Sequence, residues 1–479
     1  MDAITATLLI LAIIPAASYG WGMRGTTIGG EKGAMLPGAI IGGLLALFSD
    51  ILIVQEHFYI FSALGAIAMY FGGCMTYGET LSFSMSARPA INMKKGLGAL
   101  LLKGSLWFGV FGCIFSTGVN AVSGIYGIIE LIIIFTVTPL LAVLLHRLLN
   151  YPLNVEDNKY PRIYFSKTRR EYWGAMLGIF VALFVFNIIR GNLFSVVFPL
   201  ICAFFGGLGW VLGQLLQIYC RNYADDSASS LGRLFSSKKG VEAWKAMECV
   251  LGAFGGLGSA IGLMITHDSF RDTVYNLEMS SGLKPINNTL CLILLILWLV
   301  LLCGDMVHYF IRKPRNESKL NIIYAIYKKS LEPTEFVLYA AFPFIMICLG
   351  SDHTARITSF FILFWVIVQE VAFEEKMALK KSLILKIPLS VLGVLILVLS
   401  FVFKDLFDYR FTFILYTVIY ELLTLIVIIP EFVKDARKRF NVQNDSKLSI
   451  IKTITKGNGT IVVHGYFIIC IAITLSLII

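Results

Sequence analysis

The sequence has few charged residues for its length. Of its 479 residues, 15% are Asp, Glu, Lys or Arg, whereas soluble globular proteins carry about a quarter. No polar stretch is long enough to form a soluble domain. Apolar runs of roughly 18 or more residues, each able to cross ~30 Å of hydrocarbon, recur from end to end. We therefore expect an all-α polytopic membrane protein with one transmembrane domain over residues 1–479.

The sequence also lacks the motifs of several enzyme classes. It holds no Walker motif, no HExxH and no GxSxG. The nine cysteines form no CxxC pair, which argues against a disulfide framework and against a zinc site. The N-terminus has Asp2 and no basic segment before its apolar run, which indicates a first span and not a cleaved signal peptide. We expect no metal, no cofactor and no catalytic residues, with an enzyme as the less favoured alternative.

Fourteen apolar segments are long enough to be membrane-spanning helices. Lys and Arg concentrate in alternate connections between them, as they do on the cytoplasmic side of membrane proteins. This alternation supports the count and predicts a multi-pass protein of the cell inner membrane with both termini outside the cytoplasm. It also explains the net charge of +10 without a nucleic-acid partner. The predicted spans are residues 4–20, 34–54, 58–77, 98–117, 124–145, 172–189, 194–218, 242–265, 288–311, 335–350, 356–373, 384–403, 411–430 and 460–479.

Short similar motifs predict an internal repeat. A Gly-Trp pair occurs at the end of the first span (Trp21) and late in the seventh (Trp210). Each is followed by a glutamate, Glu31 or Glu242, then a Met and a glycine-rich helix. The pattern predicts a parallel repeat of two six-helix halves, an arrangement found in transporters whose sites form between the repeats. The predicted halves are residues 1–190 and 191–403, with two further helices in 404–479.

The strongest candidate site is the stretch from Gly20 to Gly43. It contains nine glycines and three charges between two apolar segments. Irregular backbone at membrane depth is tolerated only where it is buried in protein or lines a wet cavity. Arg24 lies between glycines, so its guanidinium is suited to binding a carboxylate or phosphate at two points, or to a structural pair with Glu31.

Tryptophans near the same predicted face provide flat surfaces for a ligand such as a sugar. The alternative for them is an aromatic belt at the membrane interface. The full set of predicted substrate-binding residues is Trp21, Arg24, Glu31, Lys32, Trp210, Gln214, Trp244 and Lys245.

Carboxylates inside spans are costly and usually functional. Glu130 is predicted about two turns from the outer end of the fifth span and Glu421 near the middle of the thirteenth. Each would couple an ion or form a structural ion pair. Glu79 follows a glycine-rich segment, and Glu248 shares a helical sector with Lys245. We predict ion coupling by Glu79, Glu130, Glu248 and Glu421.

Two further charged positions have simpler explanations. Lys103 lies about a turn and a half inside the fourth span and is expected to extend to the cytoplasmic surface. Glu171 opens the sixth span, where a carboxylate complements the helix dipole.

These features predict a secondary active transporter. It would carry a small polar solute, anionic or sugar-like, and couple this transport to protons or sodium. The expected partners are the solute, the coupling ion and membrane lipid, and a homo-oligomer is compatible with the sequence. The alternative is a membrane-embedded transferase acting on lipid-linked substrates at the cytoplasmic face, with acid–base groups among Glu79, Asp305 and His308. A scaffold without turnover is the third interpretation.

Overall fold

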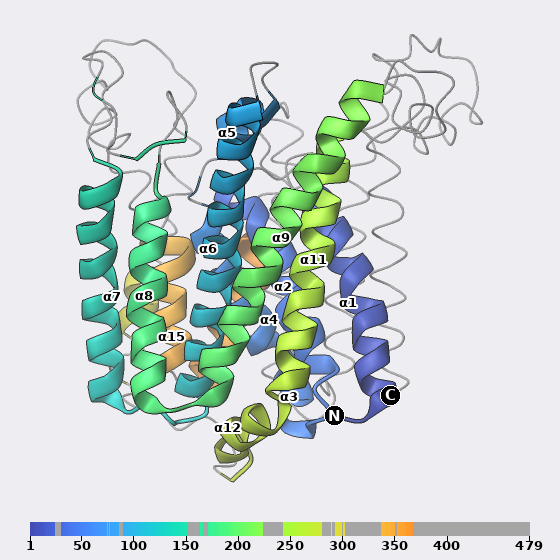
Figure 1. Ribbon diagram of the computed structural model, residues 1–479. Helices are drawn as coiled ribbons and strands as arrows, with labels where there is room; N and C mark the ends of the chain where they lie inside the picture. Colours follow the sequence, from blue (N-terminus) through green and yellow to red (C-terminus); the bar gives the residue numbers. More distant parts are fainter. Residues whose placement is uncertain are drawn as a thin grey trace, which may run out of the picture.

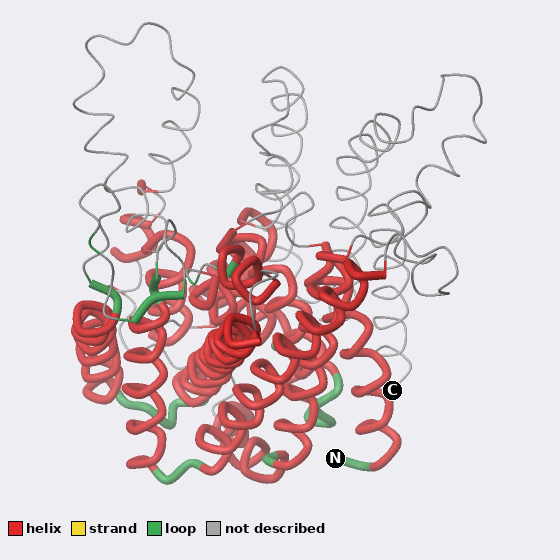
Figure 2. Tube along the Cα trace, turned by 45° about the horizontal axis from the view of Figure 1, so that its top comes forward, coloured by secondary structure: helices red, strands yellow, loops and turns green. Residues whose placement is uncertain are grey.

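The computed structural model describes residues 1–23, 30–73, 75, 77–85, 90–151, 159, 163–165, 171–223, 243–279, 289, 293–298, 300–301, 337–349 and 352–366. This part of the chain is 90% helical and contains no strand (Figure 2). Six of its helices are long and apolar enough to cross a membrane, which is consistent with a helical membrane protein. The count of fourteen spans and the internal repeat remain predictions.

Most described helices overlap predicted spans in order, although two of them lie in predicted connections. Their bounds are α1 Ala3–Met23, α2 Gly30–Leu47, α3 Leu52–Glu56, α4 Phe58–Gly73, α5 Gly78–Met85, α6 Ala90–Val122, α7 Ile128–Leu149, α8 Trp173–Arg190, α9 Leu193–Tyr223, α11 Ala243–Ile265, α12 His267–Met279, η1 Val337–Ala341, α15 Phe342–Leu349, α16 Asp352–Phe360 and η2 Phe361–Val366.

Many helix bounds differ from the predicted spans. Helix α6, for example, covers Ala90–Val122 where residues 98–117 were predicted. Two of the differences follow from turns of the chain. The second helix ends at Leu47 and not at residue 54, because the chain turns through Asp50, which has a positive φ of 58°. The fifth predicted span begins at Ile128, four residues late, because Gly124 turns the chain with φ 71° and Gly127 precedes the helix in an extended conformation. Glu130 therefore lies in the first turn of α7.

Six helices form a closed ring in which each packs against two neighbours. Their order around the ring is α1, α2, α4, α6, α9 and α11, and α11 returns to α1. Helices α7 and α8 form an antiparallel pair outside the ring, with α8 against α6 (Figure 1). The ring is narrow, since α2 also contacts α11.

We name the two ends of the bundle by their position in Figure 1. The upper end holds the last residues of α1, α7 and α9 and the first residues of α2, α8 and α11; the lower end holds the N-terminus, α3 and α12. The connection after α1, which holds Arg24, and the Lys- and Arg-rich connections after α7 and α9 thus begin at the upper end. This agrees with the predicted alternation, while the side of the membrane stays a prediction.

Glycines allow neighbouring helices of the ring to touch through their backbones. A Cβ on Gly38 of α2 would overlap the carbonyl of Gly65 in α4, and one on Gly65 would overlap the carbonyl of Gly38. On the other side of the ring, Gly252 of α11 meets Ala17 of α1 in the same way. Small residues at helix–helix contacts are typical of membrane bundles. The structure therefore assigns a packing role to these glycines.

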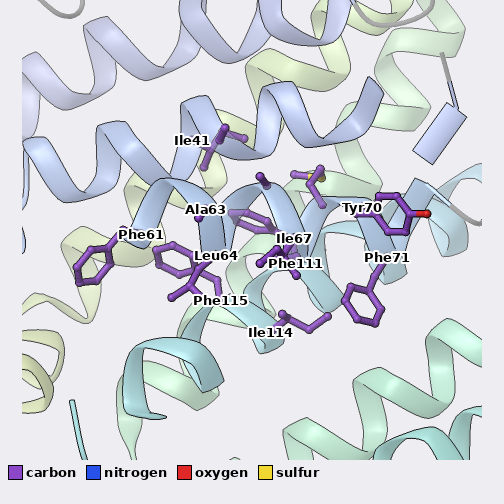
Figure 3. Packing of buried hydrophobic residues seen from close by; sticks show 14 of the residues in the cluster. Ile41, Phe61, Ala63, Leu64, Ile67, Tyr70, Phe71, Phe111, Ile114 and Phe115 are labelled. Carbon is purple, nitrogen blue, oxygen red and sulfur yellow. The ribbon is translucent and has the colours of Figure 1, made fainter. Parts of the chain in front are cut away.

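The described core is apolar and is centred on α4 and α6. Figure 3 shows Phe61, Leu64 and Ile67 of α4 facing Phe111 and Phe115 of α6. Phe111 and Phe115 are stacked, with ring centroids 5.8 Å apart.

The outer surface of the described bundle is also apolar along α7. Ile129, Ile132 and Leu140 are 69%, 56% and 65% exposed. Soluble monomers rarely expose apolar surface on this scale, whereas lipid chains tolerate it. The exposed face of α7 therefore indicates contact with hydrocarbon.

Candidate functional site

The candidate site lies inside the ring near its upper end, beside a break between two helices. Helix α4 ends at Gly73 and α5 begins at Gly78. Met75, within this break, is buried, and a Cβ on Gly73 would crowd the Cα of Glu31 in α2. Non-helical backbone inside a membrane bundle is tolerated where it is buried in protein or lines a cavity, and interrupted helices form the binding sites of many transporters. The break therefore identifies the part of the ring to search for function.

Glu248 of α11 is the best-connected carboxylate near the break. It is 1% exposed, and its Oε2 lies 2.5 Å from the Lys245 ammonium one turn earlier. Its Oε1 accepts hydrogen bonds from the Tyr77 hydroxyl at 3.2 Å and from Trp244 Nε1 at 3.1 Å. The carboxylate thus joins α11 to the break between α4 and α5.

A second buried ion pair joins α6 to the start of α8. Lys103 Nζ lies 3.4 Å from each oxygen of Glu171 and donates to Thr80 Oγ1 at 3.0 Å. The backbone N–H of Phe165 donates to Glu171 at 3.2 Å. Burial raises the pKa of Glu171 above its ordinary value of 4.5, against the opposing effect of Lys103. Glu79, in the first turn of α5, interacts electrostatically with both partners.

These contacts correct two predictions. Lys103 does not extend to the surface: it is 1% exposed and paired inside the protein. Glu171 precedes the first residue of α8 and pairs with Lys103, so its role is broader than complementing a helix dipole.

Aromatic side chains fill the inside of the helix ring between the two ion pairs. Trp107 of α6 lies between Trp21 and Trp210, with centroids 5.1 and 6.3 Å away. Tyr77 contacts Trp210 at 4.6 Å and stacks on Trp244 at 6.1 Å. Trp21 and Trp210 are fully buried, so neither belongs to an interfacial aromatic belt.

Helix α9 adds amide groups to the same region. Gln214, one turn after Trp210, donates through Nε2 to Ser84 Oγ at 2.7 Å and to the Leu81 carbonyl at 3.3 Å. Both acceptors belong to α5. Gln217, almost one further turn along, is fully buried as well. The upper half of α9 therefore presents polar groups to α5, the helix that follows the break.

The depth of the ion pairs follows from their positions along the helices. Lys103 lies roughly 28 Å from Val122, the lower end of α6, at about 1.5 Å per residue. Glu248 lies roughly 26 Å from Ile265, the lower end of α11, on the same basis. A hydrocarbon layer is ~30 Å thick. Both pairs therefore lie near the upper boundary of that layer and not at its centre.

The structure brings together most predicted site residues that it describes. The residues in or beside the aromatic and ion-pair clusters are Trp21, Trp210, Gln214, Trp244, Lys245, Glu248 and Glu79. Glu31 lies against Gly73 at the break, and the Lys32 ammonium lies 4.6 Å from the ring centroid of Tyr339. Arg24, Glu421, Asp305 and His308 lie outside the described residues.

Glu130 lies apart from this cluster. It is at the lower end, in the first turn of α7, with its side chain 27% exposed and 3.3 Å from Arg190. The predicted depth of two turns is wrong because the helix begins later than expected. Its ion pair with Arg190 corresponds to the structural alternative considered for it.

Several residues of the site were not predicted from the sequence. Tyr77 lies within the glycine-rich segment before Glu79, and Thr80 and Ser84 come after it; this region was noted only for the Glu79 carboxylate. Trp107 had no distinguishing pattern, because an aromatic residue inside an apolar span is typical of a packed core. Gln217 could have been found, since it shares one face of a span with Trp210 and Gln214.

The chemistry available is ion pairing, hydrogen bonding and aromatic contact. Among the described residues, no group of three or more His, Cys, Asp or Glu is placed to hold a metal ion. Comparisons with known protein families, curated proteins and solved structures find no match to the chain.

Proposed function

We propose that the protein is a secondary active transporter of a small polar solute, driven by protons or sodium. The observation that carries the proposal is the carboxylate of Glu248, buried inside a ring of helices and bonded across a helix break. Ionisable groups held inside membrane bundles usually mark substrate or ion pathways. Broken helices beside them are typical of transporter sites.

The contacts of Glu248 suit a group that couples ion binding to movement. Protonation would remove its charge and weaken its attraction to Lys245, and it would also weaken the charge-assisted bonds from Tyr77 and Trp244. Sodium would compete with the same donors for its oxygens. Either ion would loosen the link between α11 and the break after α4.

The glycine contacts suit small relative movements of the helices. Backbone-to-backbone surfaces, such as Gly252 on Ala17, have no long side chains to interlock. Shear between packed helices is one of the recognised modes of conformational change. We infer that α1 and α11 move against each other when Glu248 changes its charge.

Uptake into proteoliposomes tests the proposal, with radiolabelled solutes and an imposed proton or sodium gradient. We expect gradient-driven uptake by the wild type, and loss of that uptake in Glu248→Gln. Exchange of labelled for unlabelled solute should survive in this variant, because exchange needs no net ion movement. Glu130→Gln is the matched control, since Glu130 forms its ion pair at the lower end, and its uptake should equal wild type.

A membrane-embedded transferase is the second candidate, and the depth of the ion pairs favours it. Lys103 and Glu248 lie near the upper boundary of the hydrocarbon, where headgroups of lipid-linked substrates would also lie. Both side chains are 1% exposed, so a lipid-borne substrate has no direct access to them in this arrangement. Transport therefore stays first. Product formation from lipid-linked precursors, without solute uptake, would reverse the order.

A further inference from the structure

We infer that the ligand of this site is uncharged and rich in hydroxyl groups, such as a sugar or polyol. The inference rests on the proposed function, because it names the substrate class for the same site. It is carried by one stripe of α9, the side chains of Trp210, Gln214 and Gln217.

The stripe combines full burial with unused hydrogen-bonding capacity. The three side chains are 0% exposed. Within the part of the chain that the structure describes, Trp210 Nε1, Gln214 Oε1 and both polar atoms of Gln217 have no hydrogen-bond partner. Buried polar groups are nearly always paired, so a cluster of unpaired ones needs an explanation.

These atoms share one face of one helix. Positions 210, 214 and 217 follow the spacing that puts residues on one face of an α-helix. The face points to α5 and the break before it, as the bond from Gln214 to Ser84 and the contact of Trp210 with Tyr77 show. Random packing defects would not be expected to align along one face beside the ion pairs.

The kinds of atom define the ligand chemistry. Trp210 offers an N–H donor, Gln214 a carbonyl acceptor, and Gln217 both an acceptor and donors. A hydroxyl group both donates and accepts, so a molecule with several hydroxyls satisfies such a mixed set. The rings of Tyr77, Trp107 and Trp244 supply flat apolar surfaces close by, which suit the C–H face of a sugar ring.

The local charge argues against an anion. Among the described residues, the two buried cations near the stripe are Lys103 and Lys245, and each is paired with a carboxylate, Glu171 or Glu248. Bringing another negative charge into this buried region would require a further positive charge to compensate it. Among the sugar-like and anionic solutes predicted from the sequence, the described residues thus favour the sugar-like class.

The inference is tested by measuring ligand binding and thermal stability on the same protein, the 479-residue chain in detergent. The probes are uncharged glucose, galactose, mannitol and myo-inositol at millimolar concentrations, each beside its phosphorylated derivative. Thermal unfolding and tryptophan fluorescence report binding, because Trp21, Trp107, Trp210 and Trp244 surround the site. We expect at least one uncharged probe to raise Tm and change the fluorescence, and its phosphorylated partner to do neither.

The decisive variant is Gln217→Met, which keeps the side-chain length and removes the unpaired polar atoms. We expect about ten-fold weaker binding of the uncharged probe together with a Tm raised by about 1–3 °C. A merely structural amide would give the opposite stability result, a lower Tm. The matched control is Gln55→Met, whose native amide donates to the Leu47 carbonyl at 3.0 Å, so Tm should fall and binding should stay unchanged.

Three results would overturn the inference. They are binding of phosphorylated probes only, a shift with none of the probes, and a lower Tm with unchanged binding in Gln217→Met. Uptake separates this inference from the proposed function. Gradient-driven uptake of an anionic solute would contradict the uncharged ligand and support the proposed transporter. Sugar binding without any uptake would support the uncharged ligand and contradict the proposed transporter.

Discussion

The two ends of the helix ring are built from different polar groups, although the same helices supply both. At the lower end, Asn120 of α6 donates to the Tyr126 hydroxyl at 2.7 Å and to Ser195 Oγ of α9 at 2.6 Å. Tyr126 in turn donates to Asn187 of α8 at 2.7 Å, and Asn192 donates to Asn120 at 2.8 Å. We call these five residues the amide network. It contains no charge.

At the upper end, α6 and α9 carry Lys103, Trp210 and Gln217 instead. Two ion pairs and the unpaired indole and amide atoms of Trp210, Gln214 and Gln217 lie at this end. By contrast, the described lower part of α6 leaves only hydroxyls unpaired, those of Thr117 and the adjacent Ser123. A closed set of neutral hydrogen bonds fixes one arrangement, while buried charge makes the packing sensitive to protons, ions and ligands. The comparison indicates that the lower end holds the helices together and the upper end carries the function.

The largest expected effect comes from breaking an upper ion pair on one side. Lys103→Met leaves the Glu171 carboxylate buried without its partner and should lower the free energy of unfolding by about 3–5 kcal/mol. The double variant Lys103→Met/Glu171→Gln removes both charges and should recover most of that loss. Chemical unfolding of the three proteins measures it. Equal stability of the single and double variants would contradict this, because it would show that the unpaired Glu171 carboxylate carries no penalty.

A smaller effect is expected from the amide network. Asn120→Ala removes one hydrogen-bond partner from each of Tyr126, Ser195 and Asn192, and each buried polar atom left unpaired costs about 1–3 kcal/mol unless water reaches it. Stability should fall while the affinity for a bound ligand stays at the wild-type value. Thermal unfolding with and without ligand measures both. A loss of affinity matching that of Gln217→Met would remove the distinction between the two ends.

The smallest effect is a pH dependence that belongs to Glu171. Burial raises its pKa in the folded protein above 4.5, so folding favours the protonated form of this carboxyl. Its contribution to stability is complete below about pH 4.5 and decreases as the pH rises through the folded pKa. As the pH rises above about 4.5, the Tm of the wild type should therefore fall more than the Tm of Glu171→Gln. Parallel curves would show that Glu171 titrates normally.

Much of the architecture was predictable because hydrophobic length and charge alternation are local properties of a sequence. Trp21, Trp210, Trp244 and Glu248 were singled out as exceptions to the apolar pattern, and the structure places them in one cluster. The helix ends were less predictable, since the late start of α7 depends on the backbone of Gly124 and Gly127.

Pairing between distant positions was not predictable. Lys103 lies in α6 and Glu171 precedes α8, 68 residues later, and Tyr77 and Glu248 are 171 residues apart in the sequence. Lys103 and Glu171 each had a reasonable local explanation. The sequence therefore favoured a lysine that reaches the surface and a carboxylate that complements the start of a helix. Only the packing of α5, α6, α8 and α11 fixes which residues face each other.

Hydrogen–deuterium exchange along α9 tests the central difference between the two ends most directly, because one helix passes through both. Peptides covering its upper half, residues 206–218, should exchange faster than peptides covering its lower half, residues 194–204. A bound uncharged sugar should slow the upper half alone. Equal exchange in the two halves, with no change on adding ligand, would contradict the assignment of function to the upper end.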